Sequence, residues 1–292
     1  MESQGVPAAR TAADYKSEVR PVWCPGCGHY TVLTAVLKAL ADQALAPENV
    51  ALVSGIGCSS RIPAYTRLYG FHGVHGRALP AATGIKLARP ELDVLVVGGD
   101  GDGFSIGGNH FLHACRRNLD LAYVVMDNQV YGMTKGQASP TTAEDWDGSE
   151  LTPEGPGMTP VEPLRIALAA GANFVARCLS RDVAHTAATI VEAMRHPGFS
   201  FVQVLSPCVT YHPEHQKAWR DLSTERRFEA TSDAAAASAQ LAADEGFTFG
   251  VLYRGTRAAY DAPRSLAGSP AELESGFALR TAAASSGPKH VA

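Results

Sequence analysis

Asp100 and Asn128 stand at the ends of two apolar runs, and their side chains are of the kind that binds a metal ion. The runs, Val94–Val97 and Leu121–Met126, have the length and composition of buried strands, and Ile106–Arg117 between them reads as a helix. In a β-α-β unit the two strands are parallel, so their carboxyl ends meet at one edge of the sheet. A carboxylate and an amide oxygen placed together there suit a hard cation such as Mg²⁺.

The residues around Asp100 are unusually rich in glycine: Gly98, Gly99, Gly101 and Gly103. Because glycine has no side chain, backbone N–H groups in such a stretch can approach a phosphate closely. The stretch 94–137 therefore predicts a cradle for a metal-bound diphosphate. Asp and Asn are also common where a strand turns into a helix, and on these two residues alone simple capping is the better interpretation.

Cys24 and Cys27 form a C-x-x-C pair on a turn rich in proline and glycine, just before a predicted helix. Such a pair has three interpretations: half of a zinc site, a thioredoxin-like dithiol, or part of an iron–sulfur site. A dithiol of that kind would follow a clear apolar strand, whereas residues 18–22 make a poor strand. The dithiol is therefore the least favoured of the three.

The other four cysteines are of two kinds. Cys58 and Cys208 each lie in a loop directly after a predicted strand, beside glycine or proline, whereas Cys115 and Cys178 are better interpreted as small buried apolar residues. The sequence thus predicts one set of four thiolate ligands: Cys24, Cys27, Cys58 and Cys208. Four thiolates suit structural zinc or a [4Fe–4S] cluster, and the spacing does not choose between them.

These residues are positioned by elements in which strands and helices alternate. The spacing of apolar residues predicts helices over 31–44, 79–88, 106–117, 162–170, 182–195 and 229–245, and strands over 50–53, 94–97, 121–126, 173–177, 200–205 and 247–253. Residues 71–77 and 137–159 read as loops. Alternation of this kind predicts an α/β fold with a mostly parallel sheet and helices on both faces. The order of the strands is not readable from the sequence.

Composition limits the class of protein. The 292 residues carry a formal charge of −4, which does not favour binding to nucleic acid or to an anionic membrane. The longest apolar run is far shorter than the roughly 18 residues that a membrane span needs. The first residues are polar and lack the apolar core of a signal peptide, so a cytoplasmic location is expected. In that setting six cysteines favour metal or redox chemistry over a disulfide framework.

The predicted organisation has four parts. Residues 1–20 read as a flexible or extended arm, and 21–215 as the diphosphate-binding domain with the cysteine loops. Residues 216–262 are expected to form an extension that packs on the domain or on a partner chain. The tail, 263–292, is rich in Ser, Ala, Gly and Pro and is expected to be poorly ordered.

Several motifs, in this order, resemble those of a known family. Gly99-Asp100-Gly101, followed by Asp127–Gly132, is similar to the thiamine diphosphate-binding motif. The remaining motifs resemble the β subunits of 2-oxoacid:ferredoxin oxidoreductases, above all those that act on 2-oxoglutarate: Trp23–His29, Gly55–Arg61, His75–Arg77, Ser105–His110, Tyr131–Gln137 and Ser206–Cys208. The similarity covers roughly residues 18–215, with a weaker echo in Phe247–Arg254, and it implies the thiamine diphosphate-binding fold.

The resemblance also implies roles for individual residues. Asp100 and Asn128 would bind Mg²⁺ through their side chains, and Val130 through its backbone carbonyl. Arg61 would hold the distal carboxylate of the substrate, since a guanidinium can bind a carboxylate with two parallel hydrogen bonds. The four cysteines would hold a [4Fe–4S] cluster. The residues that would line the thiamine diphosphate are Ile56, Gly57, Cys58, Ser59, His75, Gly101, Asp102, Gly132 and Met133.

The implied reaction is the oxidative decarboxylation of a 2-oxoacid, expected to be 2-oxoglutarate, with coenzyme A as co-substrate and ferredoxin as electron acceptor. Thiamine enzymes also need a pyrimidine-binding module, and the chain contains one diphosphate-type module only. An α subunit that carries the other module is therefore expected as a partner. The alternatives are an enzyme for pyruvate or branched-chain 2-oxoacids, and a zinc-stabilised diphosphate-binding module without redox activity.

Overall fold

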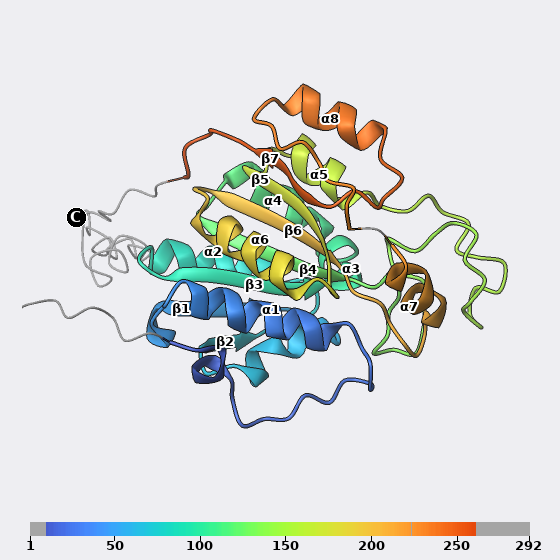
Figure 1. Cartoon of the computed structure of the whole chain (residues 1–292), viewed down its shortest axis with the longest axis horizontal. Helices are drawn as coiled ribbons and strands as arrows, with labels where there is room; N and C mark the ends of the chain where they lie inside the picture. Colours follow the sequence, from blue (N-terminus) through green and yellow to red (C-terminus); the bar gives the residue numbers. More distant parts are fainter. Residues whose placement is uncertain (1–9, 223, 261–292) are drawn as a thin grey trace, which may run out of the picture. The chain divides into compact units, whose positions relative to one another are not determined.

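The chain folds around a seven-stranded sheet, with the strand order β2-β1-β3-β4-β6-β5-β7 (Figure 1). The computed structural model describes residues 10–222 and 224–260. The strands are β1 Val50–Ser54, β2 Tyr69–His72, β3 Asp93–Gly99, β4 Leu121–Asp127, β5 Phe174–Leu179, β6 Phe199–Leu205 and β7 Gly250–Arg254. All neighbouring pairs are parallel except β5 and β7, which are antiparallel. The mostly parallel sheet expected from the sequence is confirmed.

Helices cover both faces of this sheet, and alternate residues of each strand belong to opposite faces. In β3, Val94 and Val96 pack on one side, whereas Leu95 and Val97 pack on the other. Figure 1 is viewed from the side of α1 (His29–Asp42) and α6 (Val183–Arg195). The opposite side carries α2 Ala78–Ala88, α4 Gly108–Arg117, α5 Pro163–Ala169 and α8 Ala234–Ala242. No helix in the described part of the chain is long and apolar enough to cross a membrane.

The glycine-rich stretch after β3 leads into a short helix, α3 (Asp100–Phe104), for which the sequence carried no prediction. Phe104 anchors this helix, because its ring packs against Phe111 of α4 and Phe201 of β6 at centroid distances of 5.2 and 6.0 Å. Burying such a ring contributes about 1.5–3 kcal/mol. The polar start of α3 is therefore held rigidly at the carboxyl edge of the sheet.

The structure also differs from the sequence-based prediction at several other elements. The last two residues of β2, Phe71 and His72, were expected to belong to the loop 71–77. All four residues of the strand are exposed, so it lacks the alternation of a half-buried strand. The alanine-rich helix predicted over 229–245 contracts to α8. Helix α7 (Pro213–Arg220) and the 3-10 helix at Ser59–Tyr65 were not predicted.

The predicted arm at residues 1–20 is anchored at Tyr15, which is fully buried and donates a hydrogen bond to the carbonyl of Leu45 at 2.6 Å. A single tyrosine in a polar stretch carries no signal of this contact. At the other end, β7 places part of the predicted 216–262 extension in the sheet. The division of the chain into these parts stays a prediction. The expected tail, 263–292, and residues 1–9 of the arm lie outside the described residues.

Candidate cofactor site

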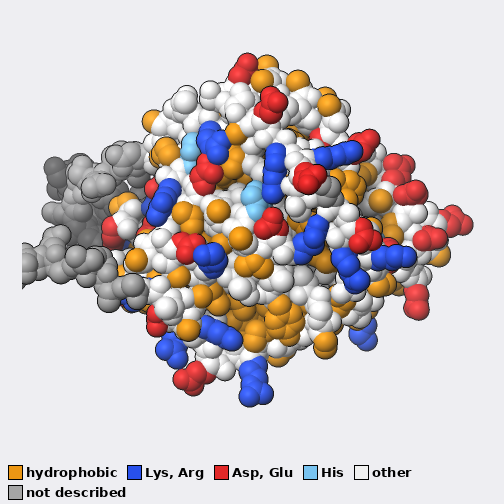
Figure 2. Space-filling view, viewed as in Figure 1, with side chains coloured by type: hydrophobic (Ala, Val, Ile, Leu, Met, Phe, Trp, Pro, Cys, Tyr) orange, Lys and Arg blue, Asp and Glu red, His pale blue; other side chains and the backbone are white. Residues whose placement is uncertain are grey.

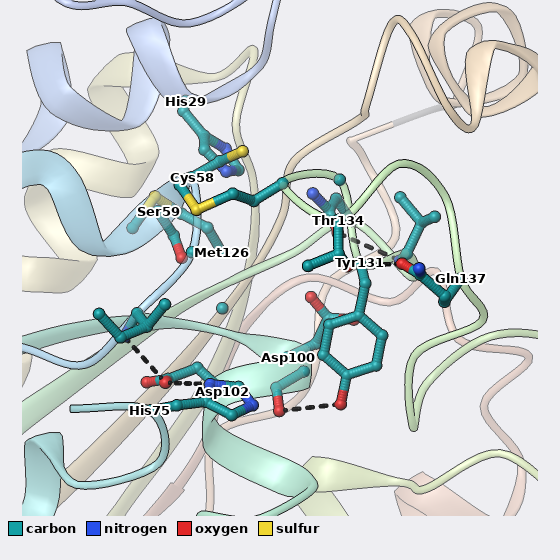
Figure 3. Close-up of a pocket in the computed structure, with 18 residues that line it drawn as sticks. His29, Cys58, Ser59, His75, Asp100, Asp102, Met126, Tyr131, Thr134 and Gln137 are labelled. Atoms are coloured by element: carbon teal, nitrogen blue, oxygen red, sulfur yellow. Dashed lines mark hydrogen bonds and ion pairs between the residues drawn. The ribbon is translucent and has the colours of Figure 1, made fainter.

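A cavity of about 400 Å³ lies at the carboxyl ends of β1, β3 and β4 (Figure 3). Its walls are the loop after β1, the start of α3 and the loop after β4. The structure brings together there every residue that was expected to bind the cofactor or Mg²⁺: Ile56, Gly57, Cys58, Ser59, His75, Asp100, Gly101, Asp102, Asn128, Val130, Gly132 and Met133. The volume and the mixture of apolar walls with a few polar groups are typical of a cofactor pocket.

Asp102 ties three segments of this pocket together. Its Oδ1 accepts hydrogen bonds from the backbone N–H groups of Ile56 (2.9 Å) and Gly76 (2.7 Å) and from Nδ1 of His75 (2.9 Å). Figure 3 shows the His75 ring lying beside this carboxylate. The imidazole Nδ1 is thereby engaged, which leaves Nε2 as the ring nitrogen available to a bound molecule. The other carboxylate oxygen, Oδ2, is buried without a partner.

Asp100 forms a buried negative end of the pocket. Its Oδ2 accepts hydrogen bonds from the hydroxyl of Thr141, at 3.0 Å, and from that of Ser139. Burial, and then the negative charge of nearby Asp127, raise the pKa of Asp100 to about 7, against the opposing effect of these hydrogen bonds. A carboxylate that is this costly to ionise by itself fits a site where a cation supplies the compensating charge.

The turn after β4 supplies the remaining oxygens of the predicted Mg²⁺ site. Asn128 Oδ1 accepts a hydrogen bond from the backbone N–H of Val130 at 3.1 Å and keeps a second lone pair. Gln129 between them has a left-handed backbone, with φ of 56°, and its carbonyl accepts a hydrogen bond from Thr142 at 2.7 Å. A carboxylate, an amide oxygen and a backbone carbonyl form a set of hard oxygens that fits Mg²⁺.

A buried polar chain extends from this turn into the protein. Asp127 accepts a hydrogen bond from the Gln203 amide at 2.7 Å, and Gln203 accepts one from Nε of Arg177 at 2.9 Å. Arg177 also pairs with Asp244. On the other side Asp127 accepts a hydrogen bond from Thr141 at 2.8 Å, so the chain reaches Asp100. Burial raises the pKa of Asp127.

The four candidate cysteines line a second, smaller cavity of about 120 Å³: Cys24, Cys27, Cys58 and Cys208. A Cβ atom added at Gly132 would lie 3.7 Å from Cys208 Sγ and 3.8 Å from Cys58 Sγ, so these two thiols flank that glycine. Burial raises the pKa of Cys27 to about 12 and also raises the pKa of Cys58. A metal centre supplies the positive charge that stabilises such thiols as thiolates.

Four thiols at one cavity fit, by their chemistry, either a structural zinc ion or a [4Fe–4S] cluster. Zinc needs its sulfur ligands about 2.3 Å from one point. Among the described residues no group of three or more His, Cys, Asp or Glu side chains is arranged to hold one metal ion. A [4Fe–4S] cluster spreads four thiolates around a larger body, which suits four cysteines around a cavity. Cys115 and Cys178 are fully buried elsewhere in the core, as expected.

Arg61 lies at the cysteine cavity and does not line the larger pocket. Its Nε donates a hydrogen bond to the hydroxyl of Tyr65 at 3.2 Å. Its positive charge lowers the pKa of Cys58, against the larger effect of burial. The substrate-binding role expected for Arg61 therefore stays a prediction, because the structure places the guanidinium beside a thiol.

The structure adds pocket residues that the sequence analysis missed. His29 is 1% exposed, its Nδ1 lies 2.8 Å from Ser206 Oγ, and burial lowers its pKa to about 4, so the ring is neutral. Tyr131 donates a hydrogen bond to the carbonyl of Gly101 at 3.3 Å. Both residues lie inside motifs of the resemblance, Trp23–His29 and Tyr131–Gln137, but neither had been given a role. Other lining residues of this kind are Gly99, Met126, Thr134 and Gln137.

A family model described as "Thiamine pyrophosphate enzyme, C-terminal TPP binding domain" matches residues 55–204. The match runs from the loop after β1 into β6, and it includes the turn after β4 and every lining residue of the pocket except His29. It accounts for the cradle of glycines and the Asp100–Asn128 pair as parts of one diphosphate-binding module.

Curated relatives are similar over most of the described chain. A 2-oxoacid:ferredoxin oxidoreductase β subunit from Saccharolobus solfataricus is 47% identical over 201 residues, which is 68% of this chain and 66% of the relative. The 2-oxoglutarate oxidoreductase subunit KorB of Mycobacterium tuberculosis is 42% identical, over 77% of this chain and 61% of the relative. The 2-oxoglutarate synthase subunit KorB of Archaeoglobus fulgidus is 46% identical, over 70% of this chain and 75% of the relative. The chain thus spans between about three fifths and three quarters of the length of these relatives.

A solved structure has the same fold. The 2-oxoglutarate:ferredoxin oxidoreductase from Magnetococcus marinus, with 2-oxoglutarate, coenzyme A and succinyl-CoA bound, matches with a TM-score of 0.80 and 41% identity. The match covers 86% of this chain and 87% of that one. With the pocket, the cysteine cavity and these likenesses together, the chain belongs to the thiamine diphosphate-dependent 2-oxoacid:ferredoxin oxidoreductase family, as a β subunit.

Proposed function

We propose that this β subunit, with an α subunit, catalyses the oxidative decarboxylation of 2-oxoglutarate to succinyl-CoA and CO₂, and passes the electrons to ferredoxin. The observation that carries the proposal is that the cofactor pocket and the cysteine cavity share walls. Cys58, Gly132, Met133, His29 and Asn128 line both. A carbanion-stabilising cofactor and an electron acceptor placed in these two cavities would be direct neighbours.

Thiamine diphosphate, when bound, supplies the electron sink that decarboxylation of a 2-oxoacid requires. The chain's own residues bind and orient it. Asp100, Asn128 and the Val130 carbonyl would hold the Mg²⁺ that neutralises the diphosphate. Ile56 and Met126 contribute apolar side chains to the wall of the cofactor pocket.

His75 is the one pocket side chain whose orientation is fixed by a buried carboxylate. Because Asp102 engages Nδ1, the imidazole presents Nε2 to the pocket, where it can hold or accept a proton. The same carboxylate holds the N–H groups of Ile56 and Gly76, so the two loops and the imidazole form one preorganised unit.

The four cysteines, by this proposal, bind a [4Fe–4S] cluster. Their support is the shared cavity and the flanking of Gly132 by two of the thiols. The positive charge of Arg61 beside Cys58 further favours the thiolate.

The mouth of the pocket supports a partner chain. Met133 lines the pocket and is 47% exposed. Val74, next to the pocket residue His75, is 69% exposed, and Ile106, which packs at Gly76 on the other side of His75, is 52% exposed. Apolar side chains at a pocket rim are typical of a surface that another chain covers. The β-subunit names of the relatives support an α subunit as this chain. The expected cytoplasmic location stays a prediction.

The choice of 2-oxoglutarate rests on the names of the relatives and of the solved structure. The test is to express the chain with its α subunit, to measure iron, sulfide and thiamine, and to follow viologen reduction. Activity that depends on coenzyme A and is fastest with 2-oxoglutarate is expected, and the β chain alone should be inactive. Faster turnover of pyruvate or 2-oxoisovalerate would overturn the substrate, and a colourless zinc protein would overturn the whole proposal.

A further inference from the structure

A third hollow, of about 180 Å³, lies on the outer side of the turn that carries Cys27. It is formed by the turn itself, by Arg181 after β5, and by Gln216 and Arg220 of α7. Cys27 belongs to the walls of both this hollow and the cysteine cavity, so only its own turn separates the two. Helix α7 lies at the carboxyl edge of the sheet (Figure 1).

The hollow is positively charged. Its lining includes two arginines, Arg181 and Arg220, and no carboxylate. Lys217, in the same helix as Arg220, is exposed, and Figure 2 shows lysine and arginine side chains over α7 on the face turned to the viewer. Arg181 is held in place because Nη2 donates a hydrogen bond to the carbonyl of Leu222. Three carboxylates on the same elements, Asp182, Glu214 and Asp221, lie outside the lining. Asp182 pairs with Arg227, and Glu214 accepts a hydrogen bond from Trp146 and pairs with His212.

The three cavities form a series in which each neighbouring pair shares a wall. The cofactor pocket shares Cys58 with the cysteine cavity, and the cysteine cavity shares Cys27 with the hollow. The hollow and the cofactor pocket share no residue. A co-substrate seated in the hollow would therefore be separated from the reacting centre, whereas a molecule that collects electrons would be next to a cluster ligand.

We propose that this hollow, with Arg181, Lys217 and Arg220 as its basic rim, is the docking surface for an acidic one-electron carrier protein. The inference rests on the proposed function, which supplies the electrons. Decarboxylation and thioester formation release two electrons per 2-oxoacid. Each docking event oxidises the reduced cluster by one electron and reduces one carrier, so two carriers are consumed in each turnover. Complementary charge steers such encounters and mainly raises the association rate.

The test compares two electron acceptors in the holoenzyme that contains the α subunit. The triple variant Arg181→Glu, Lys217→Glu, Arg220→Glu is assayed with an acidic ferredoxin and with methyl viologen. We expect kcat/KM for ferredoxin to fall about 10- to 100-fold at low salt, with a flatter dependence on ionic strength. The rate with methyl viologen and the iron content should stay within about twofold, because a small dye does not need this rim.

The matched control reverses charge at the other end of the sheet. Arg116→Glu with Arg117→Glu changes two exposed arginines at the end of α4, just before β4 begins, and should leave both acceptors unaffected. Unchanged ferredoxin kinetics in the triple variant would overturn the proposal. An equal loss with both acceptors, or a higher KM for coenzyme A with normal ferredoxin kinetics, would also overturn it. If the unaltered holoenzyme reduced neither acceptor, the proposed function itself would fail.

Discussion

Replacing Asp102 by alanine removes the one acceptor that joins the two loops of the cofactor pocket. The backbone N–H groups of Ile56 and Gly76 then lose their partner, and His75 loses the bond that orients its ring. A buried donor left without an acceptor costs about 1–3 kcal/mol, so the two N–H groups together cost about 2–6 kcal/mol. The lower half of this range is expected, because Ile56 lines the pocket and water can replace its partner there.

Asp102→Asn is the graded version of the same change. It keeps an oxygen at the Oδ1 position but removes the charge that strengthens three hydrogen bonds. It also places an NH₂ group at the position of Oδ2, which is buried and has no partner. The loss of stability should therefore lie between those of the unaltered protein and the alanine variant.

The assay is urea unfolding of the complex together with titration of thiamine diphosphate and Mg²⁺. We expect the urea midpoint to fall in the order unaltered, asparagine, alanine, and the affinity for the cofactor to fall in the same order. Misplaced positioning groups of this kind typically cost about 10²-fold in rate, so kcat should fall as well. Asp93→Asn, at the start of β3 and far from the loops, controls for the loss of a carboxylate.

An alanine variant that keeps both the urea midpoint and the cofactor affinity of the unaltered complex would refute this reasoning. A variant that loses stability but binds the cofactor normally would show that Asp102 supports the fold without preorganising the pocket.

Three other changes test the metal and cysteine sites. The pKa of Asp100 is raised to about 7, so the folded apo chain holds this proton more tightly than the unfolded chain does. Protonation of Asp100 therefore stabilises the fold fully below about pH 4, and this stabilisation is lost as the pH rises through 7. Mg²⁺ binding should then release a proton, and its affinity should increase with pH up to about pH 7. Calorimetry in buffers of different ionisation enthalpy measures this proton release. Mg²⁺ binding that does not depend on pH would contradict the prediction. Thr141→Val removes the hydroxyl between Asp100 and Asp127 and should weaken Mg²⁺ binding about tenfold. Thr141→Ser keeps the hydroxyl and should bind Mg²⁺ normally. Equal losses of affinity in both variants would show that the hydroxyl is not the cause. Gly132→Ala adds a methyl group 3.7 Å from Cys208 Sγ, which is an ordinary contact, so the chain should fold but contain less iron and sulfide. Gly84→Ala is the control, because a Cβ there has nothing within 4 Å. Full iron content in Gly132→Ala would exclude a cluster that fills this space.

The positions of most strands and helices follow from the sequence. A strand buried on both faces of the sheet needs a continuous apolar run, and a helix that packs on the sheet needs apolar residues spaced at the helical repeat. For the same reason the Asp100 and Asn128 positions are readable: each ends a parallel strand, and such ends meet at one edge. Exposed elements such as β2 and α7 were missed, since no burial pattern marks them.

Partners that come from distant parts of the chain were decided by the tertiary structure alone. Ser139 and Thr141 reach Asp100 only because the loop after β4 folds back over the pocket. Gln203 meets Asp127 because β6, and not β5, lies beside β4, and no local pattern encodes that order.

The cysteines show the same division. Their types and loop positions predicted one set of four ligands, since a thiol in a glycine- or proline-rich loop has little reason to be buried as a core residue. Their meeting around Gly132 depends on the strand order, which brings the loops after β1, β4 and β6 together. The sequence by itself thus determined the chemistry and the elements of this protein, because both are local. Only the tertiary structure decided which distant groups share a wall, because that depends on which strands pair.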